Sequence, residues 1–263
     1  MTIKMSKVIL ISIDGMRPDG LIQCGNECVK EILNSSTYTL DARTMLPSVT
    51  LPCHMSMFHS VPPERHCTLS NDYVKPVHPV TGLFEQLSRV GKRCAMYYGW
   101  EPLRDISTVG SLDAAEYINS YSFEHTDGML TDRALNYIKL AKPDFVFLYM
   151  VETDDKGGHD SGWMSETYLS YVHDAIGNAK RVIDETEGEY TVIITADHGG
   201  HDRSHGSDMP EDMTIPMILR GDAFKAGEEI HGVSILDVAP TVADVLGVPA
   251  AREWEGKSLV KIK

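Results

Sequence analysis

The chain is 263 residues long and carries a formal net charge of −14 at pH 7. This length suits one large α/β domain, and no stretch approaches the run of about 20 apolar residues that spans a bilayer, so no membrane partner is expected. Polymeric nucleic acid is not an expected partner either, because binding to its backbone relies on basic surface. The oligomeric state cannot be read from these properties.

The N-terminal region predicts a strand rather than a secretory signal. The apolar run Val8–Ile11 leads into Asp14-Gly15-Met16-Arg17, and no small-residue cleavage site follows it. The five cysteines are odd in number and include no Cys-x-x-Cys pair, which favours reduced thiols over a disulfide framework. We therefore expect a cytoplasmic protein.

Apolar periodicity predicts strands that alternate with helices along the chain. Strands are expected at 7–13, 93–98, 145–151, 190–195 and 216–219, and helices at 79–91, 130–141, 165–185 and 234–246. This alternation favours a three-layer α/β/α fold with a mostly parallel central sheet. We expect a single catalytic domain over residues 1–263, with a possible small cap within 61–128.

Polar side chains follow three of these strands at the point where each strand ends. Asp14 follows the first strand, Asp155 and His159 follow the strand at 145–151, and Asp197 and His198 follow the strand at 190–195. The carboxyl ends of parallel strands lie along one edge of a sheet, where ligands bind in such folds. Mixed imidazole and carboxylate ligands suit zinc, with manganese or iron as alternatives. A metal site is therefore expected at this edge.

Two choices among the ligands stay open at this stage. Asp154 lies beside Asp155, but the four-residue spacing to His159 favours Asp155, in what Gly157 and Gly158 indicate is a loop. His201 and His205 both follow the strand at 190–195, and either one is a candidate ligand.

The order of these motifs resembles the alkaline phosphatase superfamily, and within it the type I phosphodiesterase/nucleotide pyrophosphatase family. The resemblance runs from about residue 7 to about residue 220 and rests on five motifs: Ile13-Asp14-Gly15-Met16-Arg17, Thr50-Leu51-Pro52-Cys53-His54, Asp155…Gly158-His159, Ala196-Asp197-His198-Gly199 and His205-Gly206. It implies two divalent metal ions beside a nucleophilic threonine.

The resemblance also assigns roles to individual residues. Asp14, Asp197 and His198 would hold one metal together with the Thr50 oxygen. Asp155, His159 and His205 would hold the other, His205 being preferred because a glycine follows it. Thr50 would be the nucleophile and form a phosphothreonine intermediate. Asn71 would donate a hydrogen bond to a phosphoryl oxygen.

The resemblance leaves several reactions open. Thr50 cannot become the formylglycine that sulfatases use, and phosphomutases usually carry serine there, so a phosphodiesterase acting on a small-molecule phosphate ester is favoured. A nucleotide is one candidate, because Tyr97, Tyr98, Trp100 or Trp163 could stack a base; packing in the core is the alternative for these rings. A phosphomonoesterase or phosphonate hydrolase is the runner-up, with cations supplied by Lys156, Arg17 or Arg203. A catalytically silent metal-binding domain is a third possibility.

Overall fold

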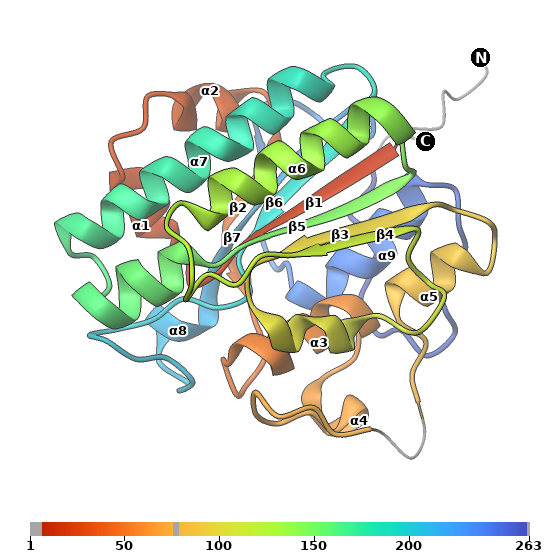
Figure 1. The fold of residues 1–263 in the computed structure, drawn as a ribbon, viewed down its shortest axis with the longest axis horizontal. Helices are drawn as coiled ribbons and strands as arrows, with labels where there is room; N and C mark the ends of the chain where they lie inside the picture. The colour runs from red at the N-terminus through yellow and green to blue at the C-terminus, as the bar shows by residue number, and fades with distance from the viewer. Residues whose placement is uncertain (1–6, 76–78, 262–263) are drawn as a thin grey trace.

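The computed structural model describes residues 7–75 and 79–261. One eight-stranded sheet forms its centre, in the order β4-β3-β5-β1-β6-β7-β2-β8 (Figure 1). Every pairing is parallel except those of β7 with β6 and β2. The strands are β1 (Lys7–Ile13), β2 (Thr37–Arg43), β3 (Cys94–Tyr98), β4 (Ala114–Tyr117), β5 (Phe145–Met150), β6 (Tyr190–Thr195), β7 (Thr214–Arg220) and β8 (Glu228–Glu229).

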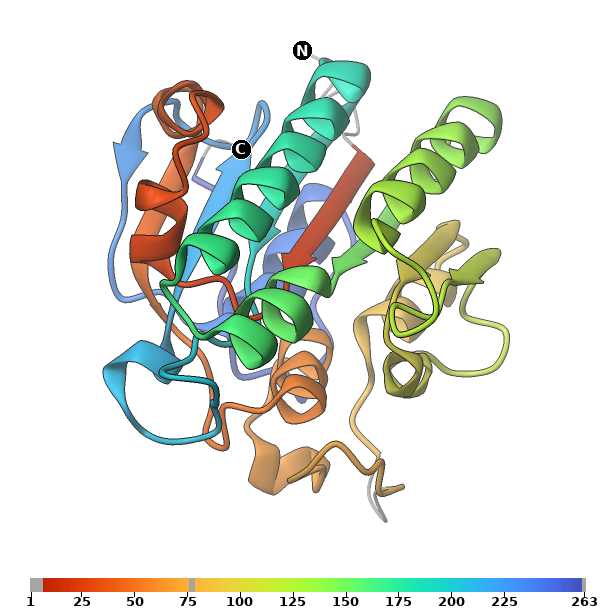
Figure 2. The same cartoon turned by 60° about the vertical axis from the view of Figure 1, so that its left-hand side comes forward.

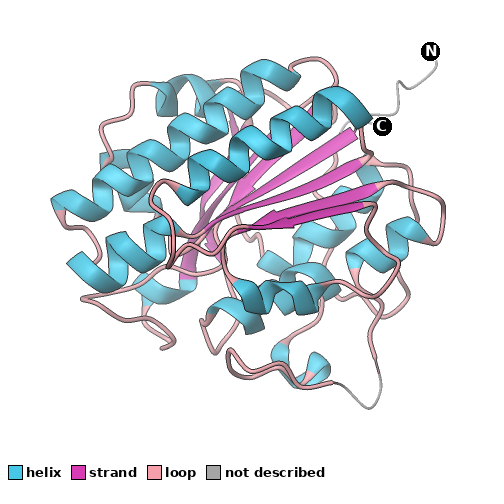
Figure 3. Cartoon of the chain, viewed as in Figure 1, coloured by secondary structure: helices cyan, strands magenta, loops and turns pink. Residues whose placement is uncertain are grey.

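Helices cover both faces of the sheet, which confirms the expected three-layer fold (Figures 2 and 3). One face carries α1 (Pro18–Gln23), α2 (Cys28–Asn34), α6 (Thr126–Ala141) and α7 (Glu166–Thr186), and the other carries α3 (Thr50–His59), α5 (Leu83–Ser88) and α9 (Val238–Val245). Shorter elements are α4 (Pro63–His66), α8 (Pro210–Met213), the 3-10 turns η1 (Glu101–Ile106) and η3 (Ile235–Asp237), and the π-helical turn η2 (Thr153–His159). No helix in the described ranges is long and apolar enough to cross a bilayer.

Burial explains which strands the sequence reveals. The β1 strand lies between β5 and β6 with helices on both faces, so it consists almost entirely of buried apolar residues. The β2 strand lies near the sheet edge and mixes buried, partly exposed and exposed positions, the exposed ones being Asp41 and Arg43. Its mixed composition does not predict a strand, and neither do the short β4 and β8.

The boundaries of two predicted helices differ from the structure. The helix expected at 79–91 covers only Leu83–Ser88, and part of its approach, 76–78, lies outside the described residues. The helix expected at 130–141 begins earlier, at Thr126, where Asp127 is buried in the first turn. An acidic residue in a first turn faces the positive end of the helix dipole, which favours that start.

The segment in which a small cap is expected, 61–128, contributes to the layered fold. The β3 and β4 strands within it belong to the central sheet, and α5 packs against α9. Its loops place Asn71, Trp100 and Tyr121 at the wall of a cavity that Thr50 also lines.

Candidate metal and phosphoryl-transfer site

Three neighbouring strands deliver the polar side chains of the site. The order β5-β1-β6 places the strand ends side by side. Asp14 follows β1, Asp154 lies in the turn after β5, and Asp197 and His198 follow β6; all four are buried. The expected convergence of distant segments is therefore present in the structure.

His198 lies at the centre of this group. Its Nε2 is 3.3 Å from Asp14 Oδ1 and 3.4 Å from Asp197 Oδ2, and it is 3.2 Å from the Thr50 hydroxyl oxygen. His205 stacks on the His198 ring at a centroid distance of 3.9 Å. His198 therefore links the hydroxyl of Thr50 to both carboxylates, and Thr50 lines the same cavity as Asp14, Asp154 and His205.

The donors form two overlapping groups suited to a metal ion. Asp14, Asp197 and His198 make one, and Asp154, His198 and His205 make the other, each with ligand atoms within 4.8 Å of one another. Asp14 Oδ1, Asp154 Oδ1 and Asp197 Oδ2 are buried without a hydrogen-bond partner. Buried carboxylate oxygens without partners are costly unless a cation compensates them, so this donor set fits bound metal.

Burial is the main cause of the pKa shifts at Asp14, Asp154 and His205. Burial, followed by the Asp197 carboxylate, raises the pKa of Asp14 well above its ordinary value. Burial raises the pKa of Asp154 to about 6. Burial, reinforced by His198, lowers the pKa of His205 to about 3, which keeps its imidazole neutral and able to bind a metal. A nearby cation would favour the ionised carboxylates.

The turn after β5 places Asp154, rather than Asp155, among these groups. Asp154 Oδ2 lies 3.4 Å from His159 Nε2, and Asp154 Oδ1 lies 3.9 Å from His205 Nε2. The prediction of a loop here is wrong, because Thr153–His159 is π-helical. A π-turn brings residues five apart together, which aligns Asp154 with His159. The four-residue spacing that favours Asp155 applies to an α-helix. Asp155 is half-buried and borders the outer side of the cavity.

Two glycines permit this turn against its neighbours. A Cβ on Gly158 would lie 2.5 Å from the Trp163 ring, and one on Gly157 would lie 3.2 Å from the Tyr168 backbone. Trp163 is fixed in turn, because its indole N–H donates to the Gly15 carbonyl oxygen at 2.9 Å. It is a packing residue of the turn, and it does not line the cavity beside Thr50.

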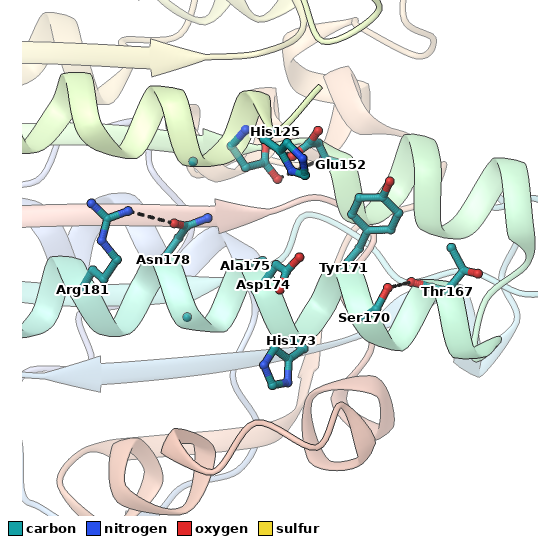
Figure 4. A pocket seen from close by; sticks show the side chains of 13 residues that line it. His125, Glu152, Thr167, Ser170, Tyr171, His173, Asp174, Ala175, Asn178 and Arg181 are labelled. Atoms are coloured by element: carbon teal, nitrogen blue, oxygen red, sulfur yellow. Dashed lines mark hydrogen bonds between the residues drawn. The ribbon is translucent and has the colours of Figure 1, made fainter. Parts of the chain in front are cut away.

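A buried carboxylate pair holds the start of the same turn. Asp127 accepts the backbone N–H groups of Val151 and Glu152 at 2.9 and 3.1 Å, and Glu152 accepts the Asp127 N–H at 3.3 Å. Lys156 Nζ lies 2.5 Å from Glu152 Oε1. These contacts tie α6 to the segment just before Asp154. Glu152 also borders a cavity between α6 and α7, to which Tyr171 and Arg181 of α7 contribute (Figure 4).

Thr50 is the first residue of the buried helix α3, and its own side chain is buried. The positive end of the helix dipole therefore faces the site. Asn71 accepts the Leu51 N–H with its Oδ1 at 3.0 Å. Because a backbone N–H must face an acceptor, this contact fixes the amide orientation and leaves the Nδ2 group to donate.

His201 lies outside the group. Its Nδ1 is 2.7 Å from Asp212 Oδ1, and this contact with Asp212 raises the pKa of His201.

Two further residues contact the site although the sequence did not predict them for it. His54, four residues after Thr50, lies 2.8 Å from the Thr50 carbonyl oxygen and 3.4 Å from Asp197 Oδ2. The Tyr149 hydroxyl donates to Asp14, but it belongs to an apolar strand that gives no sequence signal.

The cavity beside Thr50 is small, with a volume of about 90 Å³. Asp14, Thr50, Asn71, Asp154, His159 and His205 line it, together with Trp100 and Tyr121. Tyr97 and Tyr98 are buried against Tyr137 and Tyr117, which supports a packing role for both.

The family model of type I phosphodiesterase/nucleotide pyrophosphatase matches residues 8–211. The chain belongs to this family. Among curated proteins, this family member is 26% identical over 145 residues to phosphopentomutase from Alkaliphilus oremlandii, covering 54% of this chain and 36% of that protein. It is 28% identical over 137 residues to 2,3-bisphosphoglycerate-independent phosphoglycerate mutase from Clostridioides difficile, covering 50% of this chain and 26% of that protein. The chain thus spans about a third of the length of these relatives or less.

Solved structures share the fold of this phosphodiesterase-family chain. Murine ectonucleotide pyrophosphatase/phosphodiesterase 5, in complex with AMP, superposes with a TM-score of 0.81 at 16% identity, covering 96% of this chain and 97% of that one. Phosphonate monoester hydrolase from Silicibacter pomeroyi superposes with a TM-score of 0.77 at 14% identity, covering 97% and 76%. At these identities the likeness establishes the alkaline phosphatase-like fold.

Proposed function

We propose that this chain is a metal-dependent phosphodiesterase in which Thr50 is the nucleophile. The observation that carries the proposal is the position of the Thr50 hydroxyl, which lies 3.2 Å from His198 Nε2 at the junction of the two ligand groups. A structural metal site has no use for a buried hydroxyl at the N-terminus of a helix. This placement therefore argues against a catalytically silent metal-binding domain.

The proposal includes two divalent cations. Asp14, Asp197 and His198 would hold one, and Asp154, His159 and His205 would hold the other, with Asp154 replacing the Asp155 expected from sequence. These nitrogen and oxygen donors suit zinc, and also manganese or iron. Bound divalent cations would supply Lewis-acid stabilisation to the nucleophilic and leaving oxygens.

The protein's own residues supply the remaining parts of two displacements. Thr50 Oγ forms a bond to phosphorus as the bond to the leaving alcohol breaks, giving a phosphothreonine. Water then attacks this phosphorus and regenerates Thr50. The Asn71 Nδ2 group, left available by the contact of its Oδ1 with Leu51, donates to a phosphoryl oxygen, and the N-terminus of α3 stabilises the same negative charge.

The positions of the nearby cationic side chains favour diesters over monoesters. A monoester carries a dianionic phosphoryl group, which enzymes bind with additional cations. Arg17 donates instead to Asp19 and to the Gly200 carbonyl oxygen, and Lys156 pairs with Glu152. Neither these two residues nor Arg203 lines the cavity beside Thr50.

Hydrolysis assays with metal-loaded protein test the proposal. We expect turnover of bis-p-nitrophenyl phosphate to exceed that of p-nitrophenyl phosphate and p-nitrophenyl sulfate. Replacement of the nucleophile, Thr50→Ala, should lower diester kcat by about 10⁴-fold or more. Faster hydrolysis of the monoester would instead support a phosphomonoesterase. An active Thr50→Ala protein, or no turnover by the metal-loaded wild type, would refute the mechanism.

A further inference from the structure

The cavity beside Thr50 borders a wider hollow on the protein surface. This outer hollow has a volume of about 480 Å³ and lies between the loop that precedes α6 and the π-helical turn η2. Tyr121 and Asp155 line both spaces. The inner cavity, at about 90 Å³, is far smaller than the several hundred Å³ typical of pockets that enclose a whole small molecule. An ester group attached to a phosphorus beside Thr50 must therefore extend outward, and the outer hollow is the adjoining space.

The outer hollow is strongly acidic. Glu124, Asp155 and Asp160 contribute carboxylates to its lining, and Lys156 contributes the one ammonium group among the described lining residues. That ammonium is already neutralised, because Lys156 Nζ lies 2.5 Å from buried Glu152 and donates to the Phe123 carbonyl oxygen at 3.3 Å. The remaining charge in the hollow is negative.

Aromatic rings complete the lining. Tyr121 is 71% exposed and Phe123 is 53% exposed, both in the loop before α6. Exposed aromatic rings at the entrance of a cavity are suited to contact with a ligand. The face of such a ring attracts a cation, most strongly a quaternary ammonium group. Carboxylates and aromatic rings in one hollow therefore favour the same type of ligand.

We propose that the outer hollow binds the ester substituent of a phosphodiester whose alcohol carries a positive charge, of the amine or quaternary ammonium type. The inference rests on the proposed phosphodiesterase function and names its substrate class. The same hollow disfavours substituents that carry further phosphate groups, because their charge would face Glu124, Asp155 and Asp160.

Matched chromogenic diesters test the charge preference. The substrates are p-nitrophenyl phosphorylcholine, its isostere with an uncharged alkyl substituent, p-nitrophenyl 3,3-dimethylbutyl phosphate, and the p-nitrophenyl ester of thymidine 5′-phosphate. We expect kcat/KM for the choline ester to exceed that for the isostere by about 10-fold at low salt, and this ratio to fall as sodium chloride is added. A ratio near one, or fastest hydrolysis of the thymidine ester, would overturn the inference.

Variants locate the preference in the outer hollow. The double substitution Glu124→Gln with Asp160→Asn, and separately Tyr121→Leu, should each lower the ratio of the choline ester to the isostere by at least about threefold. The control Glu27→Gln removes an exposed carboxylate in the α1–α2 connection and should leave the ratio unchanged. Circular dichroism spectra and melting temperatures confirm that each variant is folded. A ratio that is unchanged in both test variants would place the preference elsewhere.

A binding measurement separates this inference from the proposed function. In zinc-loaded Thr50→Ala protein, titration calorimetry should show about 10-fold tighter binding of the choline ester than of the isostere. If wild type hydrolyses none of the diesters, the proposed function fails, and this affinity ratio still decides the inference. Equal affinities would refute the inference even in an active phosphodiesterase.

Discussion

Asp154 and Asp155 are adjacent carboxylates with different surroundings. Asp154 is buried between His159 and His205, whereas Asp155 is half-buried at the outer side of the cavity. Loss of a direct ligand weakens metal binding at least as much as loss of a supporting contact, which typically lowers affinity by about 10- to 100-fold. We therefore expect Asp154→Asn to weaken zinc binding at least 10-fold in competition with a chromogenic chelator. Asp155→Asn should retain wild-type affinity, and the reverse pattern would return the ligand role to Asp155.

His66 predicts a pH dependence of stability. It is buried, accepts the Thr68 N–H and lies 2.9 Å from Ser56 Oγ, and burial lowers its pKa to about 4. Because the unfolded state takes up a proton near pH 6.5 and the folded state only near pH 4, the stability that His66 contributes is lost as the pH falls through this interval.

Urea denaturation at pH 7 and pH 4 tests this dependence by comparing the free energy of unfolding of wild type with those of two variants. Wild type should exceed His66→Gln in stability at pH 7, and this difference should shrink by up to about 3 kcal/mol on acidification to pH 4. Subtracting the variant cancels the opposing contributions of the buried carboxylates. Leu87→Ala, which removes buried apolar surface and no titratable group, should give a difference that does not change with pH. A constant difference for His66→Gln would show that its folded-state pKa is ordinary.

At the scale of elements, the π-helical turn depends on residues without a side chain. A methyl group on Gly158 would lie 2.5 Å from the Trp163 ring. We expect Gly158→Ala to lower the free energy of unfolding by about 1–3 kcal/mol through overpacking, and to weaken metal binding because His159 shares the turn. In α6, a Cβ on Gly128 meets nothing within 4 Å. Gly128→Ala should therefore be neutral or stabilise by up to about 1 kcal/mol, and equal destabilisation by both would contradict the packing argument.

This turn also shows where prediction from sequence ends. Apolar periodicity predicts β1, β5 and β6, and the polar residues after them identify the site, because buried parallel strands leave both signals in composition. The π-helical spacing leaves no such signal. The sequence alone does not tell whether Asp154 or Asp155 aligns with His159. That alignment depends on the packing of Trp163 and Tyr168 against the two glycines of the turn. Tyr149 is likewise hidden in an apolar strand.

At the scale of the whole molecule, the order of the strands is the decisive feature. Segments around residues 14, 50, 154, 198 and 205 meet because β1 lies between β5 and β6 and because α3 begins at Thr50. The sequence predicts a parallel sheet but not this order, since strand pairing depends on contacts between distant segments. The antiparallel β7 and its neighbour β2 depend on the same long-range pairing.

The buried carboxylates predict that the stability of the whole fold depends on metal. Asp14, Asp154 and Asp197 each bury an oxygen without a hydrogen-bond partner, and the repulsion among them opposes folding until cations bind. A ligand at 100 times its Kd stabilises the native state by about 2.7 kcal/mol, and each kcal/mol raises Tm by about 2–4 °C in a domain of this size.

We therefore expect chelator-treated protein to melt about 5–10 °C below protein saturated with zinc or manganese, for each site filled. Differential scanning calorimetry measures the shift. Asp154→Asn gives the internal comparison: it removes one repelling charge and one ligand together, so its metal-free form should melt no lower than the metal-free wild type, whereas its metal-induced shift should be smaller. Melting temperatures of wild type that are unaffected by chelator and metal would mean that the three carboxylates are compensated without a cation.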